Sequence, residues 1–187
     1  TPDDPDIIFV KNYPVPKESL RRKFVRDLTG QTGFRDTMRK IRSFKLSRHW
    51  PWLTFHVGLL GVLTAVGAPW AYLMWWAAEL FVYPAIVRLR QIGEHGTALD
   101  RTSLDPRLNT GTTVAPFWQR VLIAPNDVNY HLEHHMFASI PPYRLKRLHT
   151  LLSSRGYYDE FDCISHGYGD VIRRAIRRDA PDMVPAE

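Results

Sequence analysis

The stretch W-P-W-L-T-F-H-V-G-L-L-G-V-L-T-A-V-G covers residues 50 to 67, and A-P-W-A-Y-L-M-W-W-A-A-E-L-F-V-Y-P-A-I-V comes directly after it. Between Trp50 and Val87 the only Asp, Glu, Lys or Arg is Glu79. Gly67-Ala68-Pro69 divides this block into two apolar stretches, 50–67 and 70–87, each of which would reach roughly 27 Å as a helix, near the ~30 Å thickness of a bilayer core. The pattern predicts a transmembrane helix hairpin over residues 49–88, and the alternative is a buried hairpin of a soluble protein.

Positive charge flanks this block on both sides. Residues 17 to 48 carry eleven Lys or Arg against three acidic residues, and Arg88 and Arg90 follow the second stretch, whereas the turn between the stretches has no charge. Cytoplasmic flanks of membrane spans are enriched in Lys and Arg. We therefore expect a multi-pass integral membrane protein whose two flanks, and both termini of this sequence, lie on the cytoplasmic side.

The basic segment shows apolar residues at helical spacing on either side of Gly30: Leu20, Phe24, Val25 and Leu28 before it, then Phe34, Met38 and Ile41 after it. The spacing predicts two amphipathic helices, with Gly30 as the C-cap of the first. Basic amphipathic helices beside an apolar block favour a position on an anionic membrane surface over the surface of a soluble domain. Residues 1 to 16 carry four prolines and predict an extended segment.

The remainder of the chain reads as short helices and loops. A short apolar run covers 117–124, a leucine-bearing helix is expected after Pro141-Pro142, and a final helix holding Val171 precedes a Pro-rich tail. The predicted organisation is one all-α domain with a cytoplasmic segment over 1–48, the hairpin over 49–88 and a cytoplasmic helical region over 89–187. Cys163 is the only cysteine, which excludes an intrachain disulfide and a cysteine-based metal site.

Two ionisable residues, His56 and Glu79, lie inside the apolar block. Counted from the two cytoplasmic ends, their depths would differ by only about 5 Å. Ionisable groups within membrane spans usually face a partner or a cavity. We expect them to pair or to line one polar pocket, and the alternative is that Glu79 is protonated alone between helices.

Residues 131 to 135 read H-L-E-H-H, which places three histidines at i, i+3 and i+4. On a helix these positions share one face, so His131, His134 and His135 can converge on a metal such as Fe, Zn, Cu or Ni. Glu133 points away from that face and is expected to act as a hydrogen-bond acceptor rather than a ligand. With His95 as a fourth ligand a zinc hydrolase stays open, although H-E-x-x-H is absent.

The context of this motif, N-D-V-N-Y-H-L-E-H-H-M-F-A-S-I-P-P-Y-R-L, resembles the last H-x-x-H-H box of the membrane fatty acid desaturases. The opening T-P-D-D-P-D resembles the segment directly after that family's second box, and I-G-E-H-G at 92–96 resembles its further E-H motif. The resemblance covers nearly the whole sequence. It implies a non-haem centre of two irons with His95, His131, His134 and His135 among the ligands, and Glu133, Asn129 and Gln91 near them. Gln91 stands where relatives often have Asn.

The resemblance also implies a function, namely O₂-dependent desaturation of a fatty acyl chain carried on a lipid or on CoA. The partners implied are membrane lipid and an electron donor such as a ferredoxin or a cytochrome b5-type carrier, with no nucleic acid. The first two histidine boxes are missing from the sequence, so we expect this stretch alone to bind iron poorly and to be inactive. A hydroxylase or ketolase on the same scaffold is the first alternative, and a histidine-rich membrane metal-binding protein is a less favoured one.

Overall fold

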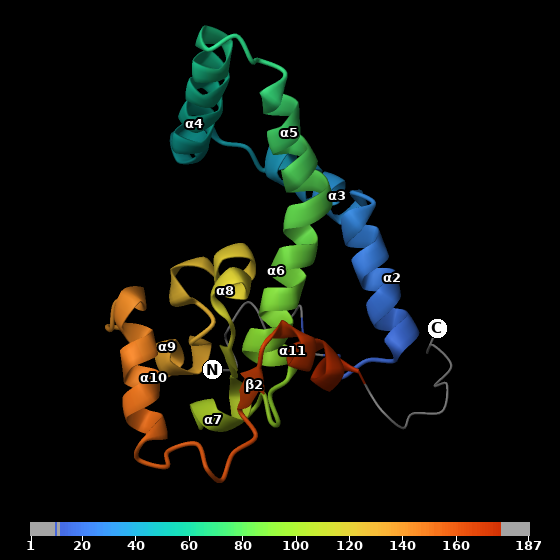
Figure 1. The fold of residues 1–187 in the computed structure, drawn as a ribbon. Coiled ribbons are helices and arrows are strands. Elements are labelled where there is room, and N and C mark those ends of the chain that lie inside the picture. The colour runs from blue at the N-terminus through green and yellow to red at the C-terminus, as the bar shows by residue number, and fades with distance from the viewer. Residues whose placement is uncertain (1–9, 11, 177–187) are drawn as a thin grey trace. The chain divides into compact units, whose positions relative to one another are not determined.

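The computed structural model describes residue 10 and residues 12–176. Figure 1 shows a mostly helical chain, and the described residues also include one pair of short strands. The described residues divide into two compact units, one formed by those up to Leu20 together with those from Val87 onward, and the other by Arg21–Ile86. The expectation of a mostly helical fold is confirmed. The predicted extended N-terminal segment and the Pro-rich tail fall largely outside the described residues.

The two amphipathic helices of the basic segment form as the sequence predicts. Helix α2 covers Lys17–Leu28 and α3 covers Gln31–Arg42. Gly30 separates them at φ 80°, in the left-handed region that glycine adopts without a steric penalty. The side chain of Asp27, which is fully buried, accepts a hydrogen bond from Thr32 Oγ1 at 2.6 Å. This bond ties the end of α2 to the start of α3.

The apolar block forms two helical arms. Helix α4 covers Leu46–Ala65, and the returning arm consists of α5 (Ala71–Ala77), a π-helical turn (Ala78–Val82) and α6 (Tyr83–Gln91). Gly33 of α3 approaches the π-helical turn so closely that a Cβ built on it would lie 2.6 Å from Leu80 Cα. Only glycine therefore fits at this contact without a backbone shift.

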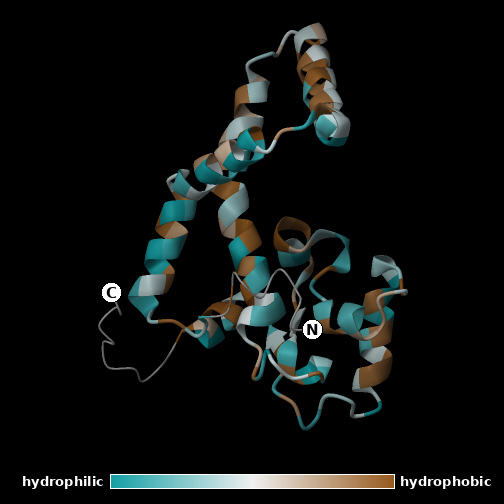
Figure 2. Ribbon diagram, turned by 180° about the vertical axis from the view of Figure 1, so that it is seen from behind, coloured by the Kyte–Doolittle hydropathy of each residue, from teal (hydrophilic) through white to brown (hydrophobic). Residues whose placement is uncertain are grey.

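Residues 49–88 form two successive helical segments joined by a turn, as predicted. Figure 2 shows hydrophobic residues along much of α4 and α5 and mainly hydrophilic ones along α2. However, no helix among the described residues has both the length and the apolar character needed to cross a membrane. Helix α4 begins early enough to include Arg48 and His49, and the second apolar stretch is shared among α5, the π-helical turn and α6. These boundaries differ from those predicted for the two membrane spans. The structure thus does not support the prediction of two membrane-spanning helices.

Most of the unit that continues from Val87 is built from short elements that come after α6. In chain order they are a second π-helical turn (Ile92–Gly96), α7 (Pro106–Asn109), β1 (Thr112–Val114), α8 (Phe117–Ile123), a 3₁₀ turn (Pro125–Asp127), α9 (His131–Met136), a 3₁₀ turn (Pro142–Arg144), α10 (Leu145–Ser153), β2 (Ile164–His166) and α11 (Tyr168–Ala175). The helices expected over 117–124, after Pro142 and around Val171 correspond to α8, α10 and α11.

Two short strands are an addition to the all-α prediction. Strands β1 and β2 pair in parallel, with Thr112 opposite Ile164 and Val114 opposite His166. Each strand has three residues, which is too short for an alternating pattern to be visible in sequence. Beside this small sheet Leu132 of α9 is buried with Tyr158 and Cys163. One face of α9 is thus packed against a hydrophobic core.

Candidate metal centre

His95 lies in the π-helical turn Ile92–Gly96 and is almost fully buried, with 2% of its surface exposed. The guanidinium group of Arg101 holds this turn, because it donates hydrogen bonds to the carbonyl oxygens of His95 at 3.1 Å and Gly96 at 3.0 Å. His95 Nδ1 lies 3.4 Å from the carbonyl oxygen of Asn109. A proton on Nδ1 facing that carbonyl leaves the lone pair of Nε2 available as a metal donor.

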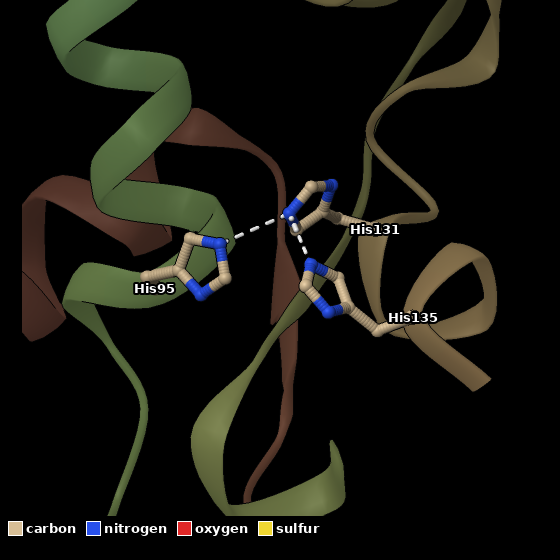
Figure 3. A group of neighbouring side chains, drawn as sticks. All are labelled: His95, His131 and His135. Carbon is tan, nitrogen blue, oxygen red and sulfur yellow. Dashed lines mark hydrogen bonds between the residues drawn. The ribbon is translucent and has the colours of Figure 1, made fainter. Parts of the chain in front are cut away.

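The other histidines come from α9, where the i, i+4 spacing places His131 and His135 on one face. His131 Nε2 lies 3.1 Å from His95 Nε2 and 3.0 Å from His135 Nε2, as Figure 3 shows. Donor atoms of all three residues lie within 4.8 Å of one another. The structure therefore joins one histidine of the π-helical turn to two histidines of a helix that begins 36 positions later in the sequence.

His134, the third histidine of the cluster, stands apart. It is exposed, and its ring centroid lies 6.0 Å from those of both His131 and His135. His134 lies three positions after His131 and one before His135, so it occupies the edge of the helix face that these two residues share, and not its centre. Of the four predicted ligands, the structure thus brings three together and leaves His134 beside them.

Burial and the neighbouring groups favour the neutral form of the His131 imidazole. Burial, followed by the nearby His135, His95, His134 and Arg90, holds the pKa of His131 well below its ordinary value. Because protonated imidazole has no lone pair to give, a depressed pKa keeps His131 able to bind a metal at neutral pH. Its Nδ1 lies 4.0 Å from a carboxylate oxygen of Glu94, beyond hydrogen-bonding distance.

The three nitrogens fit a transition-metal ion. At metal–nitrogen distances of about 2.1 Å, two ligands at right angles have nitrogens about 3.0 Å apart. The two observed separations, 3.1 and 3.0 Å, match that edge. Imidazole nitrogen suits iron as well as zinc, copper and nickel. Within the described part of the chain this is the one group of three or more candidate ligands, so the set fits one ion and does not complete a pair.

Comparison with known proteins identifies the family of this sequence. The family profile described as fatty acid desaturase matches residues 1–163. The chain belongs to the fatty acid desaturase family. No curated protein and no solved structure matches the chain. Membership confirms the resemblance drawn from the histidine motif, and it makes the protein in general terms an oxidoreductase of a family that uses iron, O₂ and fatty acyl substrates.

Three further residues were expected near the metal in this desaturase-family protein. Gln91 is the last residue of α6, one turn before His95. Asn129 is buried, and its Nδ2 donates to the carbonyl oxygen of Thr113 at 2.9 Å, which joins the segment before α9 to β1. Glu133 is fully buried on α9. Asn129 thus hydrogen-bonds to the backbone of β1 and not to a histidine. Glu133 lies on the same helix as His131 and His135.

The carboxylate of Glu133 receives three hydrogen bonds, from Thr112 Oγ1 at 2.5 Å, His149 Nδ1 at 2.6 Å and Tyr158 Oη at 2.6 Å. Burial acts to raise the pKa of Glu133, but the hydrogen bonds from His149, Thr112 and Tyr158 outweigh it and lower that pKa below its ordinary value. Burial and the bond to Glu133 raise the pKa of Tyr158, so this hydroxyl remains a donor.

Sequence reasoning missed His149 and Tyr158. A signal for His149 was present, because it lies four residues after Leu145 and so falls on the same face of the leucine-bearing helix as that buried residue. A buried imidazole needs a hydrogen-bonding partner. No comparable signal exists for Tyr158, which lies beyond the end of α10 in a turn.

The predicted pair His56 and Glu79 lies in the other unit. Both residues line a mainly aromatic cavity of about 570 Å³ formed by α3, α4 and the returning arm. Within it His56 Nδ1 lies 2.9 Å from Tyr72 Oη, and Glu79 accepts a bond from Lys40 Nζ at 2.8 Å. The two residues thus share a cavity while each has a different hydrogen-bonding partner.

Proposed function

We propose that the protein introduces double bonds into fatty acyl chains in an O₂-dependent reaction, using iron held in part by His95, His131 and His135. The observation that carries this proposal is the convergence of three imidazole nitrogens in a chain of the fatty acid desaturase family. The separations of 3.0 and 3.1 Å support an ion bound between them. His134, predicted as a ligand, is proposed to lie outside the set formed by this chain alone.

The protein residues of the proposed site hold and orient the donors. The Asn109 carbonyl faces Nδ1 of His95, which directs Nε2 toward His131. Arg101 holds the backbone of the turn that carries His95. Burial keeps His131 neutral and limits water around the donors. When bound, iron supplies the redox chemistry that activates O₂, and the protein supplies position and shielding.

Two irons need more donors than three imidazoles provide. We therefore expect these 187 residues alone to hold at most part of a two-iron centre. Ligands for the remainder would come from histidine boxes of the kind that the resemblance implies. Measuring iron in the purified chain tests this directly, because two tightly bound irons per chain would contradict it.

The partners are proposed from the surface of the unit that contains the helical arms. Large apolar side chains are exposed on α4 and α5, among them Trp50, Trp52, Leu73 and Met74. Such residues favour contact with membrane lipid, from which an acyl substrate can enter. The eleven basic residues of 17–48 suit anionic headgroups or an acidic electron carrier of the ferredoxin or cytochrome b5 type. We place this contact on the cytoplasmic side of the membrane.

The decisive experiment is a fatty acid profile of cells that express the complete protein, compared with cells expressing His131→Ala, His135→Ala and the matched control His166→Ala. His166 is an exposed histidine of β2 and lies outside the trio. We expect new double bonds with the unchanged protein and with His166→Ala, and none with the other two variants. Hydroxylated or keto products would favour the alternative activity on the same scaffold. An unchanged profile despite full expression and iron loading would refute the proposal.

A further inference from the structure

Helix α9 carries different chemistry on its two faces. His131 and His135 lie on one face, and Glu133, two residues from each, lies about 200° around the helix axis from His131. The helix has six residues. A helix this short has little stability of its own, so tertiary contacts must set its orientation.

The contacts on the face opposite the histidines converge on Glu133. Its carboxylate is fully buried and receives hydrogen bonds from β1, α10 and the turn after α10, through Thr112, His149 and Tyr158. The rings of His149 and Tyr158 stack, with centroids 5.3 Å apart and an interplanar angle of 24°. Each donor ring therefore helps to fix the orientation of the other, and together they fix the position of the carboxylate.

The same contacts reach the opposite side of the metal centre. Gly111, next to Thr112, donates its backbone N–H to the carbonyl oxygen of Glu94 at 2.7 Å, and Glu94 precedes His95. The Asn109 carbonyl faces His95 itself. Segment 109–112 thus contacts the turn that carries His95 and, through the Thr112 hydroxyl, the carboxylate of Glu133 on α9.

We propose that Glu133, His149 and Tyr158 are positioning residues for the metal centre, which fix the rotation of α9 so that His131 and His135 converge on His95. This inference rests on the proposed function, because it assumes that the three histidines bind a metal. It assigns to His149 and Tyr158 an effect on metal affinity although neither is a ligand.

The geometry of metal binding makes such positioning necessary. The outer edge of a helix lies about 5–6 Å from its axis, so a rotation of about 10° moves a group there by about 1 Å. Metal–ligand distances tolerate about 0.2 Å. Both histidines of α9 would leave the site together, because they lie on the same helix face. Loss of groups that orient metal ligands typically weakens metal binding by about 10- to 100-fold.

The test is a Co²⁺ titration of the purified full chain, followed by the visible absorption of the bound ion. Tyr158→Phe removes only the hydroxyl, and His149→Leu removes the ring donor. His149→Asn is the matched rescue, because its amide N–H can stand in for Nδ1–H. We expect the first two variants to raise the Co²⁺ dissociation constant by about 10- to 100-fold with an altered absorption band, and His149→Asn to restore most of the affinity.

Two controls separate positioning from a general loss of stability. Val15→Ala removes buried volume from a segment that pairs with Ile176 and makes none of the hydrogen bonds to Glu133, and it should lower the melting temperature while leaving Co²⁺ affinity unchanged. His166→Ala controls for the loss of a histidine. Wild-type affinity in both Tyr158→Phe and His149→Leu, or an equal loss in Val15→Ala, would overturn the inference while the metal site stands. If the unchanged chain binds no Co²⁺ and His131→Ala behaves identically, the metal site fails and the inference fails with it.

Discussion

The separation of His134 from its two neighbours leads to a direct comparison. His134→Ala and His135→Ala remove chemically identical side chains from adjacent positions of α9. His135 Nε2 lies 3.0 Å from His131 Nε2, whereas the His134 ring is exposed with its centroid 6.0 Å from both neighbouring rings. We expect His135→Ala to remove a metal donor and His134→Ala to remove none.

The size of the difference can be worked from ordinary metal-site energetics. Four-ligand structural zinc sites bind with about 10–16 kcal/mol, or about 2.5–4 kcal/mol per ligand. Loss of His135 should therefore weaken Co²⁺ binding by roughly 60- to 700-fold, since each 1.4 kcal/mol is a factor of ten. Loss of His134 resembles an exposed substitution, worth about 0.5 kcal/mol, and should change the dissociation constant by roughly twofold.

The assay is isothermal titration of the purified chain with Co²⁺ at neutral pH for both variants, with circular dichroism as a check on folding. The unchanged chain should bind one ion. Equal losses of affinity in the two variants would show that His134 also serves as a ligand, and the reasoning from the structure would then be wrong. A larger loss for His134→Ala would refute it more strongly.

Three further predictions concern stability and reactivity. Gly33→Ala places a Cβ 2.6 Å from Leu80 Cα and should lower the free energy of unfolding by about 1–3 kcal/mol. A Cβ added at Gly61 meets no atom within 4 Å, so Gly61→Ala should raise the free energy of unfolding by about 0.5–1 kcal/mol. Urea denaturation measures both changes. Burial raises the pKa of the Cys163 thiol from 9.0 to about 11. At mildly alkaline pH the thiolate fraction of Cys163 should therefore be roughly 100-fold lower in the folded than in the unfolded chain, and its rate of reaction with a disulfide reagent should fall by the same factor. The folded-state pKa of Glu133 lies below its ordinary value of 4.5, so its ionisation stabilises the fold above that pH, and this contribution is lost as the pH falls through the folded-state value. Glu133→Gln should therefore flatten the acid side of the urea-midpoint profile, and an unchanged slope below pH 4.5 would contradict the assignment.

Local pattern in the sequence was sufficient for much of the helical framework. The spacing of apolar residues around Gly30 predicted α2 and α3, because amphipathic periodicity and a glycine cap are local properties. The i, i+4 spacing of His131 and His135 was sufficient to place both imidazoles on one face of a helix. The motif and its context also identified the family, which the family profile confirms.

The apolar block shows where local pattern did not give the helix boundaries. Its two 18-residue apolar stretches predicted two complete membrane spans. Helix boundaries depend on where backbone hydrogen bonding continues, and the helices observed do not begin and end where the apolar stretches do. Helix α4 extends back through basic residues, and the returning arm changes its hydrogen-bonding pattern at Ala78. A hydropathy count contains no information about either change.

The sequence by itself determined which residues could bind a metal, and the tertiary structure decided which of them meet. His95 and His131 are 36 residues apart, and only the packing of the π-helical turn beside α9 brings their nitrogens to 3.1 Å. The same packing leaves His134 at the edge of the site and gives the buried carboxylate of Glu133 its donors from β1, α10 and the following turn. Such contacts join distant parts of the chain, so they depend on how helices and strands pack and leave no trace in residue spacing.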